Sequence, residues 1–239
     1  MQATRSQLRL RSRLDARLEL VDRAVRLPRL GITYDVCLPA AVAPLLAASH
    51  TDPPHPLPYW ALPWPSGIAL AEALLTGAGD VAGQRALELG CGLGITATAS
   101  LCSGARLTVT DYASAALLLC RLNTLRNAGC APRTLQLNWL CPRPVLFRLA
   151  RQRFPLLLAA DVLYDARDVA PLLDLMERLV APHGSFWLAE PGRQTAARFV
   201  AAARGGGWRD EVTEHHGPWS DRLDQGVVVN VHRLQRAAG

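Results

Sequence analysis

The chain has 239 residues, of which 26 are basic and 20 acidic, with a formal net charge of +6 and a pI near 9.4. Every basic residue is an arginine, and eight of them lie in the first thirty residues, which carry +5 and leave +1 for the rest of the chain. Such a near-neutral body does not support a nucleic-acid-binding face, which needs clustered cations, and a hydrophobic content of 50% excludes a disordered chain.

The first thirty residues are predicted to form an amphipathic helix docked on the rest of the chain. Leu8, Leu14, Leu18, Val21 and Val25 recur at helical spacing, with arginines between them. A basic partner-binding arm or an organelle-targeting peptide is the alternative. Prolines then crowd residues 50–67, which favours an ordered loop over a helix interior. We therefore expect a basic helical extension with a proline-rich loop over 1–57 and a main domain over 58–239.

Beyond the prolines, helical and strand-like segments alternate along the chain. Helices are predicted at 67–77, 95–102, 113–128, 169–180 and 194–204, and strands at 85–89, 106–110, 134–137, 155–160, 185–189, 208–213 and 227–234. This alternation predicts an α/β, Rossmann-like doubly wound fold, with a seven-stranded, mostly parallel sheet covered on both faces. No helix separates the last two strands, so they are predicted to form an antiparallel hairpin at the sheet edge.

A glycine-rich turn follows the first of these sheet strands. Gly90 and Gly92 would let the backbone approach a ligand, but the third glycine, Gly94, comes one residue too early for the GxGxxG dinucleotide pattern. Glu88, two residues before the turn, would repel a pyrophosphate and attract a cationic ligand. Asp111 ends the next strand, about 20 residues past the first glycine, where a carboxylate can accept both ribose hydroxyls. A turn whose glycines serve packing alone is the alternative.

An acid before a GxGxG turn, with a second acid after the next strand, resembles the class I (seven-β-strand) S-adenosyl-L-methionine (SAM)-dependent methyltransferases. The Trp-containing stretch 58–71 and the DxxY motif at 161–164 look like the protein lysine methyltransferases of that class, and residues 137–139 resemble their (D/N)W segment. The sequence Glu-Pro-Gly-Arg at 190–193 is similar to the D-P-G-R stretch of the electron-transfer-flavoprotein β-subunit lysine methyltransferases. The resemblance covers roughly residues 58–236.

The resemblance implies which residues contact SAM and which face the methyl acceptor. In many relatives an Asp at this position contacts the adenine amino group. This sequence has Asn138 there, and the departure puts that contact in question. Asp161 and Tyr164 are implied as the catalytic pair, with Asp161 positioning the amine and acting as a candidate proton acceptor. The implied cofactor contacts are Trp64, Glu88, Gly90, Cys91, Gly92, Gly94, Asp111, Asn138, Trp139 and Ala160.

The implied activity is SAM-dependent transfer of methyl groups to lysine side chains of another protein. A small-molecule N- or O-methyltransferase and a non-catalytic methyltransferase-like partner subunit are the alternatives. We expect a monomer with a protein substrate, no nucleic-acid or membrane partner and no metal. His215 and His216 lack metal-ligand spacing, and a solvated loop is expected there.

Cysteine usage and the absence of a secretory signal predict the compartment. The six cysteines include no CxxC pair, which favours buried free thiols in a reducing environment. The N-terminus lacks the apolar segment of a secretory signal, and no apolar run approaches the ~18 residues of a membrane span. A cytoplasmic location is therefore expected.

Overall fold

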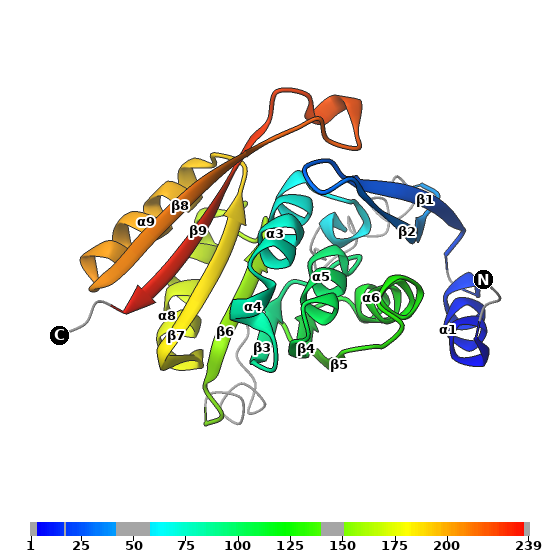
Figure 1. The fold of residues 1–239 in the computed structure, drawn as a ribbon, viewed down its shortest axis with the longest axis horizontal. Helices are drawn as coiled ribbons and strands as arrows, with labels where there is room; N and C mark the ends of the chain where they lie inside the picture. The colour runs from blue at the N-terminus through cyan, green and yellow to red at the C-terminus, as the bar shows by residue number, and fades with distance from the viewer. Residues whose placement is uncertain (1–3, 17, 42–57, 140–150, 237–239) are drawn as a thin grey trace, which may run out of the picture.

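A seven-stranded sheet forms the centre of the molecule (Figure 1). The computed structural model describes residues 4–16, 18–41, 58–139 and 151–236. The sheet order is β5-β4-β3-β6-β7-β9-β8; β3 to β7 pair in parallel, while β9 runs antiparallel to both β7 and β8. This confirms the predicted doubly wound sheet and the antiparallel hairpin at its edge. The strands are β3 (Arg85–Leu89), β4 (Arg106–Asp111), β5 (Arg133–Gln136), β6 (Phe154–Ala160), β7 (Val180–Glu190), β8 (Trp208–His216) and β9 (Val228–Arg236).

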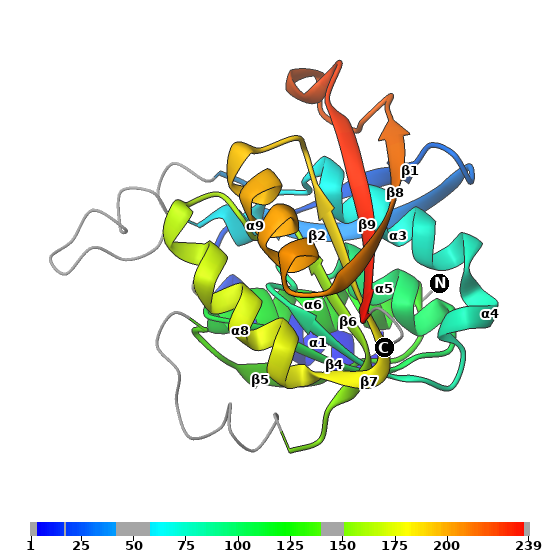
Figure 2. The ribbon, with the colours of Figure 1, turned by 90° about the vertical axis from the view of Figure 1, so that its left-hand side faces the viewer.

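Helices cover both faces of the sheet because its central strands are apolar on both sides. In β6, Leu156 and Leu158 point into one hydrophobic cluster, and Leu157 and Ala159 into the other. Helices α8 and α9 lie on the opposite face from α3, α5 and α6 (Figure 2). The helices are α3 (Pro65–Thr76), α4 (Ala78–Val81), α5 (Ile95–Cys102), α6 (Ser114–Asn127), α8 (Val169–Leu179) and α9 (Gln194–Gly205), with short 3₁₀ turns η1 (Tyr59–Ala61), η2 (Ala166–Asp168) and η3 (Arg222–Asp224).

The N-terminal segment differs from the single helix predicted for it. Helix α1 (Arg5–Asp15) is present, but β1 (Leu20–Leu27) and β2 (Ile32–Pro39) then form an antiparallel hairpin. Val25 and Leu27 are buried, whereas Arg26 between them is exposed, so burial alternates at the end of β1. The prediction of a helix beyond Asp15 was wrong because spaced leucines and valines also fit a strand, and pairing with β2 decides between the two.

One buried amide joins the hairpin to the main sheet layer. The Asn123 side chain accepts a hydrogen bond from the Cys37 N–H at 2.8 Å and donates to the Cys37 carbonyl at 3.0 Å and to the Leu93 carbonyl at 2.9 Å. Cys37 lies in β2 and Leu93 in the glycine-rich turn after β3. The hairpin and the turn are thus held by the same side chain of α6.

Two expectations about polar side chains also need correction. His215 does not lie in a solvated loop: β8 extends to His216, and His215 is buried with its Nδ1 3.6 Å from Glu72 Oε2 of α3. Cys37, Cys91 and Cys120 are buried free thiols as predicted, but Cys102 and Cys130 are exposed. Cys141 and the proline-rich stretch 50–57 lie outside the described residues.

Within the described ranges, no helix is long and apolar enough to cross a membrane. The same ranges hold no group of three or more His, Cys, Asp or Glu side chains placed to bind a metal ion.

Candidate active site

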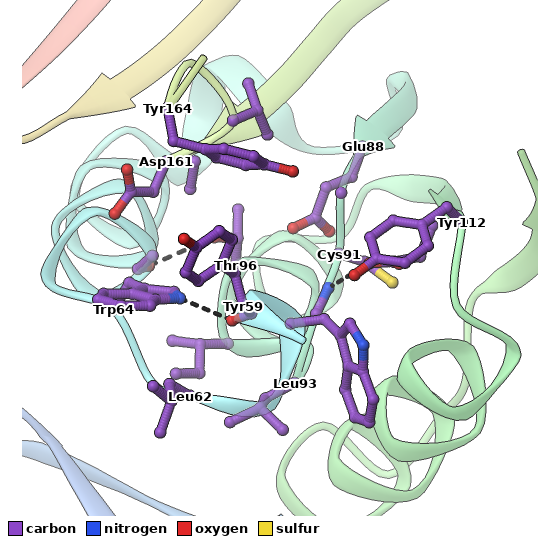
Figure 3. Close-up of a pocket in the computed structure, with 18 of the residues that line it drawn as sticks. Tyr59, Leu62, Trp64, Glu88, Cys91, Leu93, Thr96, Tyr112, Asp161 and Tyr164 are labelled. Atoms are coloured by element: carbon purple, nitrogen blue, oxygen red, sulfur yellow. Dashed lines mark hydrogen bonds between the residues drawn. The ribbon is translucent and has the colours of Figure 1, made fainter. Parts of the chain in front are cut away.

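A pocket opens at the carboxyl ends of β3, β4 and β6, where the strand order reverses direction across the sheet (Figure 3). Open α/β sheets bind ligands in this crevice. Its empty volume is about 800 Å³, a figure that includes the solvent space at the open mouth. It is lined by Tyr59, Trp60, Leu62, Trp64, Gly67, Glu88, Gly90, Cys91, Gly92, Leu93, Ile95, Thr96, Asp111, Tyr112, Leu137, Trp139, Ala160, Asp161, Val162 and Tyr164.

The pocket brings together most of the residues singled out from the sequence. Ten of the twelve predicted cofactor and catalytic residues line it, and the two that do not are Gly94 and Asn138. Tyr59 and Tyr112 also line it, although the sequence did not single them out. Their signals were positional: Tyr112 directly follows Asp111, and Tyr59 stands inside the Trp-containing segment.

The turn after β3 approaches the pocket with bare backbone. Gly92 has φ +46°, and a Cβ there would lie 3.2 Å from the Trp60 carbonyl oxygen. Gly94 has φ +81° and starts α5, and a Cβ there would lie 2.8 Å from Cys120 Sγ and 2.9 Å from its Cα. Gly94 therefore serves the packing of α5 against α6, while Gly92 forms part of the pocket wall.

Replacing Gly94 with alanine is expected to lower the free energy of unfolding by about 3 kcal/mol, because left-handed strain and overpacking add together. Gly83→Ala is the matched control: its φ is +74°, but nothing lies within 4 Å of an added Cβ, so only the strain of about 1 kcal/mol remains. Urea denaturation of both variants measures the difference. Equal losses would contradict the assigned packing contact.

Asp111 ties the end of β4 to the glycine-rich turn. Its Oδ2 accepts a hydrogen bond from the Gly92 N–H, and its Oδ1 accepts one from the Ala113 N–H, both at 3.0 Å. Burial raises the pKa of Asp111 to about 6, although these N–H groups favour the anion. The carboxylate is thus already oriented on the pocket wall, where hydroxyl groups of a ligand can reach it.

Glu88 supplies a second carboxyl group to the same wall. It is buried, and no group in the described part of the chain makes a hydrogen bond to its Oε2. Burial and the neighbouring Asp111 carboxylate raise the pKa of Glu88 well above its usual value. A buried oxygen without a partner is costly unless a ligand donates to it. A ligand with hydroxyl groups and a cationic or amino group, as in SAM, fits this pair of acids.

Aromatic rings form the mouth of the pocket next to Asp161 (Figure 3). The Tyr59 ring lies edge-on to the Tyr164 ring at a centroid distance of 5.0 Å and to the Trp64 ring at 6.2 Å. Trp64 Nε1 donates to the Tyr59 carbonyl at 2.7 Å. This contact orders the segment before α3 and brings its rings against the turn after β6.

Asp161 sits in that turn in a left-handed conformation, with φ +53°. Its N–H donates to the Ala189 carbonyl, and its Oδ1 accepts a hydrogen bond from Arg193 Nε at 2.9 Å. Its side chain is only 5% exposed. A non-glycine residue held at positive φ beside a pocket is a common feature of functional sites.

A chain of polar contacts holds the turn that carries Arg193. The Arg193 N–H donates to Glu190 Oε2 at 2.9 Å, and Asn230 donates to Glu190 Oε1 at 2.7 Å. His232 lies between Glu190, with Nε2 3.6 Å from Oε1, and Asp210, with Nδ1 3.1 Å from both carboxylate oxygens. Burial disfavours the imidazolium, but the two carboxylates outweigh burial and raise the pKa of His232 to about 9.

The stability of the fold is therefore expected to fall as the pH rises through about 9. A histidine whose folded-state pKa is raised stabilises the fold fully below its unfolded pKa of about 6.5, and this stabilisation is lost as the imidazolium deprotonates. The free energy of unfolding should decrease by about 3 kcal/mol between pH 6.5 and 9.5 in the wild type. Denaturant titrations at both pH values, run beside His232→Gln, measure it. An equal decrease in the variant would contradict the role of His232.

The sequence of this chain is similar to those of known methyltransferases. Residues 61–202 match a family model described as lysine methyltransferase. The electron transfer flavoprotein beta subunit lysine methyltransferase of Danio rerio is 32% identical over 146 residues, covering 59% of this chain and 52% of that protein. EEF1A lysine methyltransferase 3 of Mus musculus is 28% identical over 179 residues, covering 72% of this chain and 70% of that protein. The chain spans about half the length of the flavoprotein-subunit methyltransferases that it matches.

Solved structures support the fold. The N-methyltransferase NodS of Bradyrhizobium japonicum, in complex with S-adenosyl-L-homocysteine, has a TM-score of 0.55 and 18% sequence identity, covering 82% of this chain and 98% of NodS. At this identity the likeness concerns the Rossmann-like methyltransferase fold alone.

Proposed function

Because the chain belongs to the lysine methyltransferase family, we propose that it transfers methyl groups from SAM to lysine side chains of another protein. The observation that carries the proposal is the juxtaposition of two parts of one pocket: the Glu88 and Asp111 wall, and the aromatic mouth at Asp161. The first part suits an amino-acid nucleoside, and the second suits a long side chain that ends in an amine.

The proposed cofactor contacts follow from the pocket wall. Asp111 would accept hydrogen bonds from ribose hydroxyls, and the orphaned Glu88 Oε2 would accept one from an amino group. Bare backbone at Gly90 and Gly92 would allow close approach, and Trp139 would flank the base. When bound, SAM supplies a methyl group that its sulfonium already activates.

The proposed work of the protein is to bind and align the acceptor. The rings of Tyr59, Trp64 and Tyr164 exclude water from an entering side chain, and desolvation favours the neutral amine that can react. Asp161 orients the amine through its carboxylate. Alignment of this kind lowers a barrier by several kcal/mol, and by up to ~7–11 in ideal intramolecular cases.

The proposed acceptor is a lysine on a separate protein chain. This chain has no lysine at all, so methyl-lysine formed by it has to appear elsewhere. Its relatives at 32% identity are named for the electron transfer flavoprotein beta subunit, which makes that subunit the first acceptor to test. Free thiols at all five described cysteines support a reducing compartment, and we propose the cytoplasm.

The test incubates the protein with methyl-labelled SAM and either the zebrafish flavoprotein subunit or a host lysate lacking this gene. Hydrolysis of the labelled protein should yield N-methyl-lysine, and calorimetry should show SAM binding. Label confined to small molecules would favour a small-molecule methyltransferase, and label in methyl-histidine would reject lysine as the acceptor. Absence of SAM binding would favour a non-catalytic partner subunit.

A further inference from the structure

We propose that Arg193 is a positioning residue that controls the protonation of the entering amine by neutralising Asp161. This inference rests on the proposed function, because it assumes that an amine enters at Asp161. Arg193 Nε lies 2.9 Å from Asp161 Oδ1, and the two side chains are 39% and 5% exposed. A nearly buried carboxylate at the pocket mouth thus already carries a cation, supplied by a residue 32 positions away in the sequence.

The turn after β7 holds this guanidinium in place. Gly192 has φ +78°, which reverses the chain after β7, and the Arg193 N–H is fixed by Glu190 Oε2. Arg193 then begins α9 as its N-cap residue, with extended backbone. Glu190 is itself held by Asn230 and His232. The position of the Arg193 backbone is therefore set by buried contacts and does not depend on its contact with Asp161.

The charges of Arg193 and Asp161 together affect the pKa of an amine that enters the pocket. A lysine amine has a reference pKa of about 10.4 and has to lose a proton before it can accept a methyl group. A carboxylate alone would favour the ammonium and hold it in the unreactive form, whereas a neighbouring cation lowers the pKa of an amine. The contact with Arg193 engages Asp161 Oδ1. Oδ2 can then accept a hydrogen bond from the amine while the net charge of the pair stays near zero.

Other charged and titratable groups face the same turn from several elements. Asp224 in η3 and Tyr164 interact electrostatically with Asp161, and Glu190 faces the Arg193 backbone. Asp168, Asp111 and Tyr59 in turn interact electrostatically with Tyr164. All of these remain when Arg193 is replaced, so a difference between the wild type and an Arg193 variant isolates the guanidinium.

The first test measures amine binding directly. n-Butylamine, which carries the lysine side-chain ammonium, is titrated calorimetrically at pH 7.5 into the protein saturated with S-adenosyl-L-homocysteine. The Arg193→Gln variant should bind the ammonium about tenfold more tightly than the wild type does. In the variant the ammonium no longer competes with a guanidinium for the Asp161 carboxylate. Arg193→Lys, which keeps the charge, should stay near the wild-type affinity. Arg167→Gln is the matched control, since it removes an exposed arginine paired with Asp165 in the segment after Tyr164.

The second test is the pH profile of methyl transfer to the flavoprotein subunit. In Arg193→Gln the acidic limb of kcat should move up by about one pH unit, which lowers kcat about tenfold at pH 7.5 while KM falls. Arg193→Lys should restore the wild-type profile, and Arg167→Gln should not move it.

A merely structural role for Arg193 predicts the opposite pattern. Amine binding that is weaker, unchanged or undetectable in both proteins would overturn the proposal, as would a loss of kcat with an unmoved pH profile. If the wild type transfers no methyl group to lysine yet Arg193→Gln tightens amine binding, the proposed function fails and the charge pairing stands. Thermal unfolding of each variant accompanies both tests.

Discussion

Replacing Asp161 with asparagine is expected to reduce the rate of methyl transfer at least a hundredfold, with SAM affinity kept within about threefold of the wild type. Asparagine keeps the shape of the side chain and tolerates the left-handed backbone found at this position, φ +53°. It removes the charge that we propose orients the amine and that pairs with Arg193 Nε at 2.9 Å. Steady-state kinetics on the labelled acceptor and calorimetry with SAM measure the two quantities separately.

Asp165→Asn is the matched control for that variant. Asp165 follows Tyr164 closely and caps η2 by accepting a hydrogen bond from the Arg167 N–H at 2.9 Å. Asparagine caps equally well, so turnover should change less than twofold. Normal turnover in Asp161→Asn, with normal SAM affinity, would remove Asp161 from the reaction.

Replacing Asp111 with alanine is expected to weaken SAM binding about a hundredfold, which corresponds to about 2.7 kcal/mol. The change removes the acceptor proposed for the ribose hydroxyls, and it also leaves the Gly92 and Ala113 N–H groups without their carboxylate partner. Calorimetry with SAM measures the loss. Asp174→Ala, which breaks an exposed ion pair with Arg178 on α8, should leave SAM affinity unchanged.

The wild type should also bind SAM more weakly in acid. Burial raises the pKa of Asp111 to about 6, so the anion proposed to accept both ribose hydroxyls is depleted below that pH. Between pH 7.5 and 5.5 the affinity should fall about fourfold, following the ionised fraction of one carboxyl group. A Kd that stays constant over this range would mean that the ionised form is not required.

Local patterns in the sequence were enough to predict the main sheet. An apolar run such as β6 is recognisable from its own sequence as a strand that is buried on both faces. The glycines at 90, 92 and 94 indicate a turn, because they adopt backbone conformations that few other residues adopt. The chain order of strands and helices then leaves few topologies. Most of the pocket followed because carboxyl ends of parallel strands meet at one edge.

The features that the sequence did not predict depend on contacts between distant segments. β1 reads equally well as a helix until β2 pairs with it, and His215, in the part of β8 past Thr213, is buried next to Glu72 of the distant helix α3. Arg193 and Asp161 are 32 residues apart, and nothing local to either residue specifies the contact. Gly94 fitted the cofactor pattern in spacing, yet the nearest atoms to its missing side chain belong to Cys120 of α6.

The amide of Asn123 has a consequence for how this sequence can diverge. It meets the carbonyl and N–H of Cys37 and the carbonyl of Leu93, and all of these are main-chain groups. Main-chain groups are retained when a side chain is substituted. These hydrogen bonds therefore do not restrict the residue types at 37 and 93, which only the packing of their side chains constrains. Only position 123 has to keep its chemistry. In homologues that retain the hairpin we therefore expect an invariant asparagine facing two variable partners, a pattern that co-variation between positions would not reveal.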